Sequence, residues 1–232
     1  MEKDKNTLPK RLIKAIGIIF LYFFITAFYR DFLLIFGINY SNLNGISKTI
    51  YLILYDAGLA ILLIYIYKKD FLNNFKDYIK NISKYLDFIR IWIVALILMV
   101  ISNAIIINFT TEKAADNQQA IIDQMHIFPI YVIVSAIVTA PIIEEIIFRL
   151  TFRKVIKNNI LFIIISGLTF GALHVITSYT NVTDLLFIIP YSIPGCAFAY
   201  MLVKTDNICV PISMHMLHNT IMIIFQLIAL NK

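Results

Sequence analysis

The chain has 232 residues, of which 60% are hydrophobic and only 15% charged, and its formal net charge is +6. A soluble domain is nearer half apolar and a quarter charged, so this composition predicts an integral membrane protein surrounded by membrane lipid. The net positive charge does not require a nucleic-acid partner. Lysines and arginines gathered at the cytoplasmic ends of membrane helices give the same excess, so we expect no nucleic acid.

Apolar runs long enough to cross a bilayer recur along the chain, which predicts a single all-α integral membrane domain over residues 1–232. The spans are expected at about Ile13–Tyr29, Thr49–Tyr67, Ile89–Ile107, a fourth beginning near Pro129, Ile160–Tyr179, Asp184–Lys204 and Ile208–Leu230. Phe32–Ile38 is too short to cross alone and is expected to be interfacial or re-entrant unless it crosses together with its neighbours. We therefore predict a polytopic membrane helix bundle with seven or eight transmembrane helices.

Two stretches between these spans are more polar. In Lys68–Arg90, Phe71, Phe75 and Ile79 recur at helical spacing with lysines between them. This pattern predicts an amphipathic helix on an anionic membrane surface rather than on nucleic acid. Asn108–His126 has three acidic residues and one lysine, and we expect it to be a polar loop.

The basic residues divide unevenly between alternate connections. With the N-terminus in the cytoplasm, the inner segments contain sixteen lysines and arginines and the outer segments four. Cytoplasmic loops of membrane proteins carry such an excess of positive charge. We therefore predict a multi-pass protein of the cell membrane with a cytoplasmic N-terminus; seven spans would place the C-terminus outside, and eight inside.

Three groups of polar residues interrupt the apolar runs in the second half of the chain. They are Glu144, Glu145 and Arg149 in the fourth span, His174 in the fifth, and His215 and Asn219 in the seventh. An ionised side chain at the bilayer centre costs at least about 2.5–3.5 kcal/mol. Three such groups within six residues of the fourth span therefore need partners or a function.

The spacing of these residues predicts that the three groups meet. Glu144 and His174 each lie fifteen residues from the turn expected near Asn159, which is about 22 Å along two antiparallel helices and hence at similar depth. His215 and Asn219 are four residues apart, as are the second glutamate and the arginine, so each pair shares one helix face. We expect one cavity that opens toward the cytoplasmic half of the membrane.

Such a set permits two kinds of chemistry. A carboxylate and an imidazole facing one water can deprotonate it for attack on a carbonyl, and a second imidazole with an amide can hold the resulting oxyanion. Alternatively, Glu144, His174 and His215 form a His₂Glu set that could bind zinc and activate the water. Structural roles are the other interpretation: an ion pair within the fourth span, and histidines that hydrogen-bond between helices. Asp56, in the second span, is expected to be structural.

At these residues the chain resembles the CPBP intramembrane proteases, which include the type II CAAX prenyl proteases and bacterial Abi proteins. The family pattern is E-E-x-x-x-R, then F-x-x-x-H, then H-x-x-x-N or D, on separate membrane helices. Here the motifs stand in order as Glu144-Glu145…Arg149, Phe170…His174 and His215…Asn219. The resemblance covers about residues 125–225, the motif-bearing catalytic helices. The N-terminal half matches only in being hydrophobic.

The resemblance implies a role for each motif residue. Glu144 would be the base that activates water, assisted by His174. His215 and Asn219 would stabilise the oxyanion or complete a metal site. Glu145 and Arg149 would hold the helix and the electrostatics of the site. The family is described both as metalloproteases and as acting through a metal-free glutamate, so zinc bound by Glu144, His174 and His215 remains one of two alternatives.

The function that the resemblance implies is an intramembrane endopeptidase acting on a peptide or protein with a membrane-proximal cleavage site. Peptide processing and bacteriocin self-immunity are the roles expected from the family. Two other classes of protein stay open from the sequence: a non-proteolytic membrane scaffold or immunity protein, and a small transporter whose buried glutamate and histidine relay protons.

Overall fold

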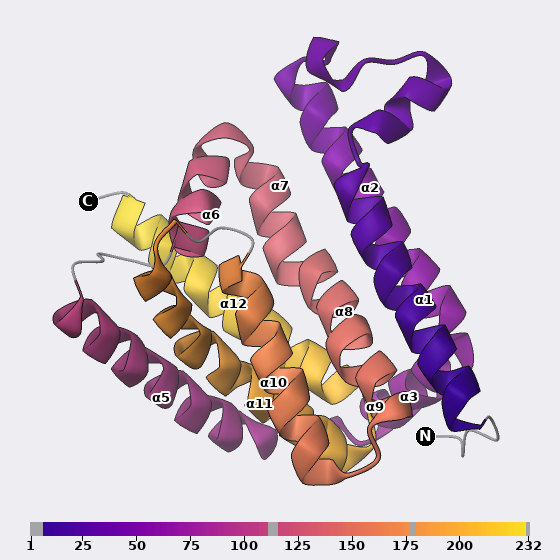
Figure 1. Cartoon of the computed structure of the whole chain (residues 1–232), viewed down its shortest axis with the longest axis vertical. Coiled ribbons are helices and arrows are strands. Elements are labelled where there is room, and N and C mark those ends of the chain that lie inside the picture. The colour runs from indigo at the N-terminus through magenta and orange to yellow at the C-terminus, as the bar shows by residue number, and fades with distance from the viewer. Residues whose placement is uncertain (1–6, 111–115, 177–179, 231–232) are drawn as a thin grey trace.

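The structure is a computed structural model that describes residues 7–110, 116–176 and 180–230, and within these residues the chain is helical without strands. The first half contains α1 (Leu8–Ala27), the 3₁₀ turns η1 (Asp31–Phe36) and η2 (Tyr40–Asn42), α2 (Gly45–Ile66), α3 (Lys68–Lys80), α4 (Ile82–Tyr85), α5 (Phe88–Phe109) and α6 (Asp116–Ile127). The second half contains a long run from α7 (Pro129–Val134) through η3 (Ser135–Thr139), α8 (Ala140–Glu144) and η4 (Glu145–Thr151) to α9 (Phe152–Val155), then α10 (Asn159–Ile176), η5 (Val182–Phe187), α11 (Ile188–Thr205) and α12 (Cys209–Leu230). The predicted all-α membrane architecture is confirmed (Figure 1).

Six helical runs among the described residues are long and apolar enough to cross a membrane. They are Gly45–Ile66, Ile82–Phe109, Pro129–Val155, Asn159–Ile176, Val182–Thr205 and Cys209–Ile228. The first expected span, α1, is not among them, because Lys10, Arg11 and Lys14 occupy its first two turns. Its uncharged remainder, residues 15–27, is shorter than the roughly 20 residues that a crossing needs. The expected count of seven or eight is therefore not confirmed.

The polar loop expected over Asn108–His126 is a wrong prediction, because α6 occupies most of it. Polarity suggested a loop, but the helix buries one apolar side chain: Met125 is 4% exposed and packs with Val132 and Ile223. An amide–carboxylate hydrogen bond between Gln119 and Asp123, one turn apart, supports its outer face. The amphipathic stretch after the second span is helical as expected, in α3 and α4.

Helix ends coincide with residues whose local chemistry starts or stops a helix. α2 begins after Asn44, whose side-chain oxygen accepts a hydrogen bond from the Ser47 amide at 2.8 Å. α7 begins at Pro129, where the missing amide proton removes no helical hydrogen bond. α11 ends at Asp206, whose φ of 50° lies in the left-handed region that aspartate tolerates better than most residues. The chain then reverses directly into α12.

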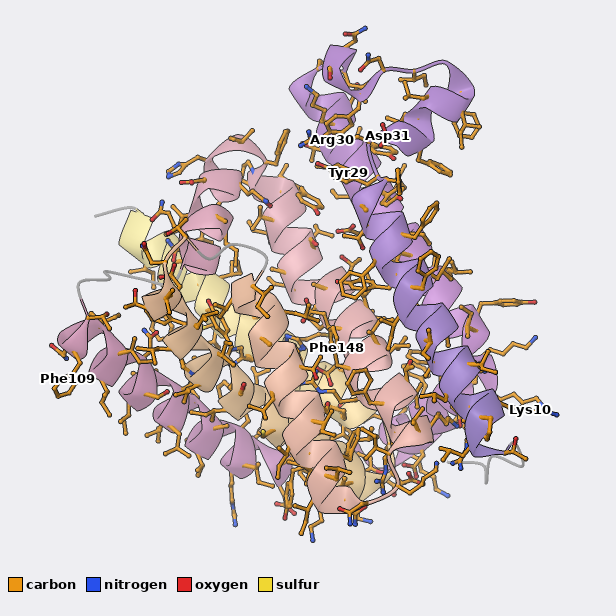
Figure 2. All side chains as sticks on the ribbon, viewed as in Figure 1. Lys10, Tyr29, Arg30, Asp31, Phe109 and Phe148 are labelled. Atoms are coloured by element: carbon orange, nitrogen blue, oxygen red, sulfur yellow. The ribbon has the colours of Figure 1, made fainter. Side chains whose placement is uncertain are left out.

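Three segments that were expected on one side of the membrane meet at one end of the bundle. Arg11 in α1 donates to the Lys154 carbonyl in α9 at 3.1 Å, and Lys154 forms a 2.7 Å ion pair with Asp70 in α3. In Figure 2, Lys10 marks this end of α1, and Tyr29 lies at the opposite end. These segments therefore lie at the same end of the bundle, as the predicted topology requires, whichever compartment that end faces.

α10 and α11 approach each other so closely that side chains larger than those present would not fit. A Cβ atom added to Gly171 would lie 2.6 Å from the Ile188 carbonyl oxygen and 2.7 Å from the Ser192 amide. A Cβ atom added to Gly167 would lie 2.9 Å from the Cys196 amide nitrogen. Small residues four apart are the usual means by which membrane helices pack backbone to backbone. This contact fixes where α11 presents its Gly195 carbonyl.

Two buried asparagines join the turn between α11 and α12 to α3. Asn207 is 1% exposed and donates from Nδ2 to the Asn74 carbonyl and to Asp77 Oδ2, both at 2.8 Å. The Asn74 side chain in turn accepts from the Ile208 amide at 2.7 Å. A buried polar group left without a partner costs about 1–3 kcal/mol, so this network holds α3 against the end of the bundle.

Replacing Asn207 with alanine should lower the free energy of unfolding by about 1–3 kcal/mol, because the Asn74 carbonyl and the Cys209 amide would lose their side-chain partner. The measurement is the midpoint of thermal unfolding of the purified protein in detergent. Asn73→Ala is the matched control, since Asn73 is exposed beside Asn74 and should leave the midpoint unchanged. Equal midpoints for the two variants would contradict this account of the network.

Candidate functional site

The helix that carries the two glutamates is not regular. It changes from α to π geometry at η3 and again at η4, so Glu144 is the last residue of α8 and Glu145 the first of a π turn. The side-chain hydroxyl of Thr151 donates to the carbonyl of Ile146, five residues earlier, at 2.9 Å. Pro141 has no amide proton to donate to the preceding turn. Isolated π turns within helices are frequent at functional sites, and periodicity alone did not indicate them.

Glu145 and Arg149 form an ion pair that is completely enclosed by protein. Both side chains are 0% exposed, and Arg149 Nε lies 3.1 Å from Glu145 Oε2. Arg149 also donates from Nη2 to the Gly195 carbonyl at 3.1 Å. Its guanidinium carbon lies 4.4 Å from the centre of the Phe170 ring, within cation–π range. The ion pair predicted from the spacing of the two residues is therefore present, and it connects the glutamate helix to α10 and α11.

His215 stands between the two glutamates. Its Nδ1 lies 2.9 Å from Glu145 Oε1, and its Nε2 lies 3.9 Å from Glu144 Oε2. The ring is 2% exposed and stacks on Phe198, with the ring centres 5.0 Å apart. A histidine that donates from Nδ1 to a carboxylate has its tautomer fixed and offers the Nε2 lone pair. The buried pair therefore orients His215 toward Glu144.

Glu144 differs from its neighbour in its exposure and in the charge that it faces. Its side chain is 21% exposed, whereas that of Glu145 is fully enclosed. Neither Oε2 has a hydrogen-bond partner among the described residues, but Glu145 Oε2 lies against the Arg149 guanidinium and Glu144 Oε2 does not. Tyr22 of α1 packs against the hydrophobic cluster to which the glutamate helix contributes Ile143. Glu145 is thus enclosed in an ion pair, and Glu144 is partly exposed.

His174 and Asn219 lie at the margin of this cluster. His174 Nδ1 is 2.9 Å from the carbonyl of Phe170 in its own helix, and the ring packs on that of Tyr191 with the centres 5.1 Å apart. The Phe170 ring lies 5.6 Å from that of His215, so one aromatic ring relates the two histidines. Asn219 donates to the Ala136 carbonyl at 2.7 Å and thereby joins α12 to η3. The roles that the resemblance assigns to these two residues stay predictions.

Sequence reasoning missed several partners of the site. The Gly195 carbonyl and the Phe198 ring contact the charged cluster but belong to no polar motif. Trp92 of α5 donates to His218 Nδ1 at 3.4 Å, which gives that histidine a structural partner. Asp56 of α2 accepts from Ser135 of η3 at 2.8 Å. Only Asp56 had a signal in the sequence, as an acid in the middle of an apolar span.

The described residues contain no group of three histidine, cysteine, aspartate or glutamate side chains placed to hold a metal ion. Glu144, His174 and His215 therefore do not form a ready zinc site in this arrangement. Both histidines direct Nδ1 to an acceptor, Glu145 for His215 and the Phe170 carbonyl for His174. Zinc binding by these residues remains a prediction from the sequence.

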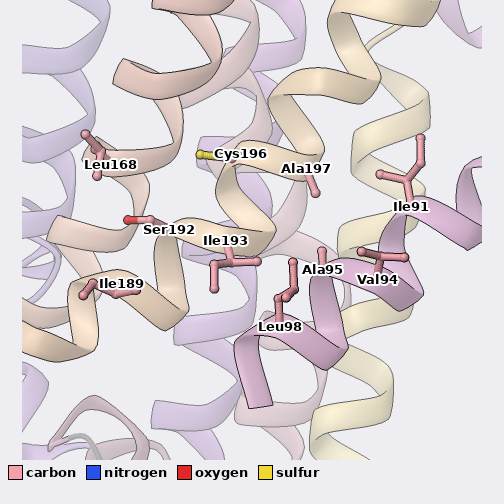
Figure 3. A pocket seen from close by; sticks show the side chains of 10 residues that line it. All are labelled: Ile91, Val94, Ala95, Leu98, Leu168, Ile189, Ser192, Ile193, Cys196 and Ala197. Carbon is pink, nitrogen blue, oxygen red and sulfur yellow. The ribbon is translucent and has the colours of Figure 1, made fainter. Parts of the chain in front are cut away.

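A separate groove of about 440 Å³ lies on the outer surface between α5, α10 and α11 (Figure 3). Leu168, Ile189 and Leu98 are among its mostly apolar lining residues. It contains none of the motif residues, and its walls are those expected of a surface that contacts lipid chains.

Comparisons with known proteins point to the same part of the chain. Residues 126–221 match the family described as "Type II CAAX prenyl endopeptidase Rce1-like". Over 122 residues the chain is 37% identical to a Bacillus subtilis (strain 168) protein named "Putative membrane peptidase YdiL". That alignment covers 51% of this chain and 46% of the relative, so the match spans about half the length of each. No solved structure matches the chain.

The division of the two glutamates predicts that replacing Glu145 lowers stability and replacing Glu144 does not. Glu145→Gln would leave the Arg149 cation enclosed without its counter-charge and should destabilise the protein by about 3–5 kcal/mol. Glu144→Gln removes a carboxylate that is partly exposed and should leave the thermal midpoint in detergent close to that of the wild type. Similar midpoints for the two variants would show that the glutamates are not divided in this way.

Proposed function

We propose that this protein is an intramembrane endopeptidase, since residues 126–221 match the type II CAAX prenyl endopeptidase family. The motif residues lie on three of the apolar helical runs found in the described part of the chain. The observation that carries the proposal is the partly exposed Glu144, whose Oε2 has no hydrogen-bond partner and faces His215 Nε2 across 3.9 Å. That distance lets one water molecule contact both atoms.

Glu144 is the proposed general base. It would take a proton from a water that is held against the scissile carbonyl, and the resulting hydroxide would attack that carbon. The same carboxyl group would then protonate the leaving amine. A glutamate does this best when it is desolvated yet open to substrate, which is how Glu144 lies at the margin of the enclosed cluster.

His215 is the proposed second contact for the water or the oxyanion. Because Glu145 accepts from Nδ1, the imidazole is held in one orientation as charge develops at Nε2. Glu145 and Arg149 are positioning residues in this scheme, since they reach the reacting atoms only through His215.

His174 and Asn219 complete the proposed site. Asn219 uses its amide nitrogen to donate to the Ala136 carbonyl, and an amide group has a second N–H that can reach an oxyanion. The Phe170 ring contacts both histidines, with its centre 4.4 Å from that of His174 and 5.6 Å from that of His215, and His174 would assist the base when substrate is bound. Zinc held by Glu144, His174 and His215 is the alternative way to activate the water, and no step above depends on it.

The chain is proposed to lie in the cell membrane with a cytoplasmic N-terminus, on the basis of its charge distribution. Its substrates would be peptides or proteins cleaved near the membrane surface, in peptide processing or bacteriocin self-immunity. A scaffold that binds partners without cleaving them and a proton-linked transporter remain rival functions. Neither rival function explains why Glu145 is enclosed in an ion pair while Glu144 is partly exposed.

Glu144→Gln should abolish proteolysis, because a general base contributes about 10²–10⁴-fold to such reactions. Comparative mass spectrometry of membrane-associated peptides from cells with the wild type and with Glu144→Gln would measure the loss and identify the substrate. Asp123→Asn removes the same charge from an exposed position on α6 and is the matched control.

Peptide patterns that are the same for wild type and Glu144→Gln, at equal expression, would overturn the proposal. A scaffold would keep its cellular effect in that variant, and a transporter would show proton- or substrate-linked flux in liposomes without any cleaved product.

A metal-free site predicts purified protein with zinc well below one ion per chain, measured by elemental mass spectrometry, and full activity after chelation. His174→Ala should then lower activity without changing the metal content. Stoichiometric zinc that is lost in His174→Ala would instead establish the zinc mechanism.

A further inference from the structure

Asp56 is a charged group in the apolar second span that the proposed mechanism does not use. It lies near the middle of α2, where an ionised side chain costs at least about 2.5–3.5 kcal/mol. No lysine, arginine or histidine in the described part of the chain forms an ion pair with it. The protein thus keeps an acid within the membrane without supplying its counter-charge.

The neighbours of Asp56 hold its carboxylate in place but do not saturate it. Ser135 Oγ donates to Oδ2 at 2.8 Å, and Tyr131 lies one turn earlier on the same helix. A carboxylate has about four lone-pair directions, so one hydroxyl donor leaves capacity for a cationic group. Both neighbours belong to the helix that carries the glutamates, so Asp56 is oriented by the wall of the candidate site.

Asp56 and Glu144 lie on two helical segments that pack along each other. α2 contacts α7, η3 and α8 in turn. Ser135 precedes Glu144 by nine residues, about 13 Å along a helix, and extended peptide covers this distance in roughly four residues.

We propose that Asp56, together with Ser135 and Tyr131, forms a subsite for a cationic side chain of the substrate, lysine or arginine, about four residues from the scissile bond. The ammonium or guanidinium would supply the counter-charge that the protein lacks and would fix the register of the peptide at Glu144. The register rests on the proposed function, whereas binding of the cation does not require cleavage.

The subsite can be tested by binding in the Glu144→Gln background, which prevents cleavage and removes the competing carboxylate. The probes are two fluorescent apolar peptides of about 20 residues, identical except that one contains a single lysine and the other acetyl-lysine at that position. Affinities are measured with protein in lipid nanodiscs. We expect the lysine peptide to bind about tenfold more tightly, since a charge-assisted hydrogen bond in a dry site is strong.

The preference for lysine should disappear in Asp56→Asn, which keeps the shape of the side chain and removes its charge. It should persist in Asp56→Glu and in the matched control Asp31→Asn, which removes an exposed acid in η1. Equal affinities for the two peptides before Asp56 is changed, including no binding of either, would overturn the proposal. So would a preference that survives Asp56→Asn, since Asp56 would then be only a hydrogen bond between helices.

The failure of this inference is distinguishable from failure of the proposed function. Undiminished proteolysis by Glu144→Gln would remove the general base but leave the binding comparison intact. Loss of proteolysis in Glu144→Gln with no lysine preference would keep the protease and remove the subsite. If the protease function and the Asp56 subsite are both correct, the cleavage sites found by mass spectrometry should have lysine or arginine three to five residues from the cleaved bond.

Discussion

The burial of Arg149 is the constraint on which the rest of the arrangement depends. A guanidinium enclosed within a membrane protein is tolerated only if an opposite charge and polar or aromatic partners are held beside it. Glu145 supplies the charge, the Gly195 carbonyl accepts one donor, and Phe170 covers one face of the guanidinium plane. These partners come from different helices, so α10 and α11 must approach closely, and their glycines allow that approach.

The same pair decides what its neighbours can do. Because Glu145 is committed to Arg149, its second oxygen is held at His215 and orients that ring. Glu144 is the last residue before the π turn, and it faces His215 Nε2 from the edge of this cluster. A buried ion pair that contributes little net stability can thus still specify one geometry for a reactive site.

The first half of the chain contributes more than a hydrophobic anchor. Tyr55 of α2 donates to the Ile25 carbonyl at 2.7 Å and joins α1 to α2 (Figure 1). α2 in turn packs on the glutamate helix, where Asp56 accepts a hydrogen bond from Ser135. In the proposed function, the second half of the chain, which contains the family match, supplies the catalytic residues. The first half supplies α2, which selects the substrate.

The sequence by itself determined the all-α membrane class, most of the long helices, the one-turn spacing of Glu145 and Arg149, and the ordered motifs. Those features are local: they follow from hydropathy, helical period and the cost of a buried charge. Only the tertiary structure decided that His215 lies between the two glutamates, that the glycines of α10 admit α11, and that Asp56 is hydrogen-bonded to the helix of the glutamates. These depend on helix rotation, π turns and backbone approach between segments far apart in the chain, which no local pattern encodes. The sequence shows Glu145 and Arg149 only as charges that are costly to bury. The packing of α10, α11 and α12 around them shows that Glu145 also orients His215.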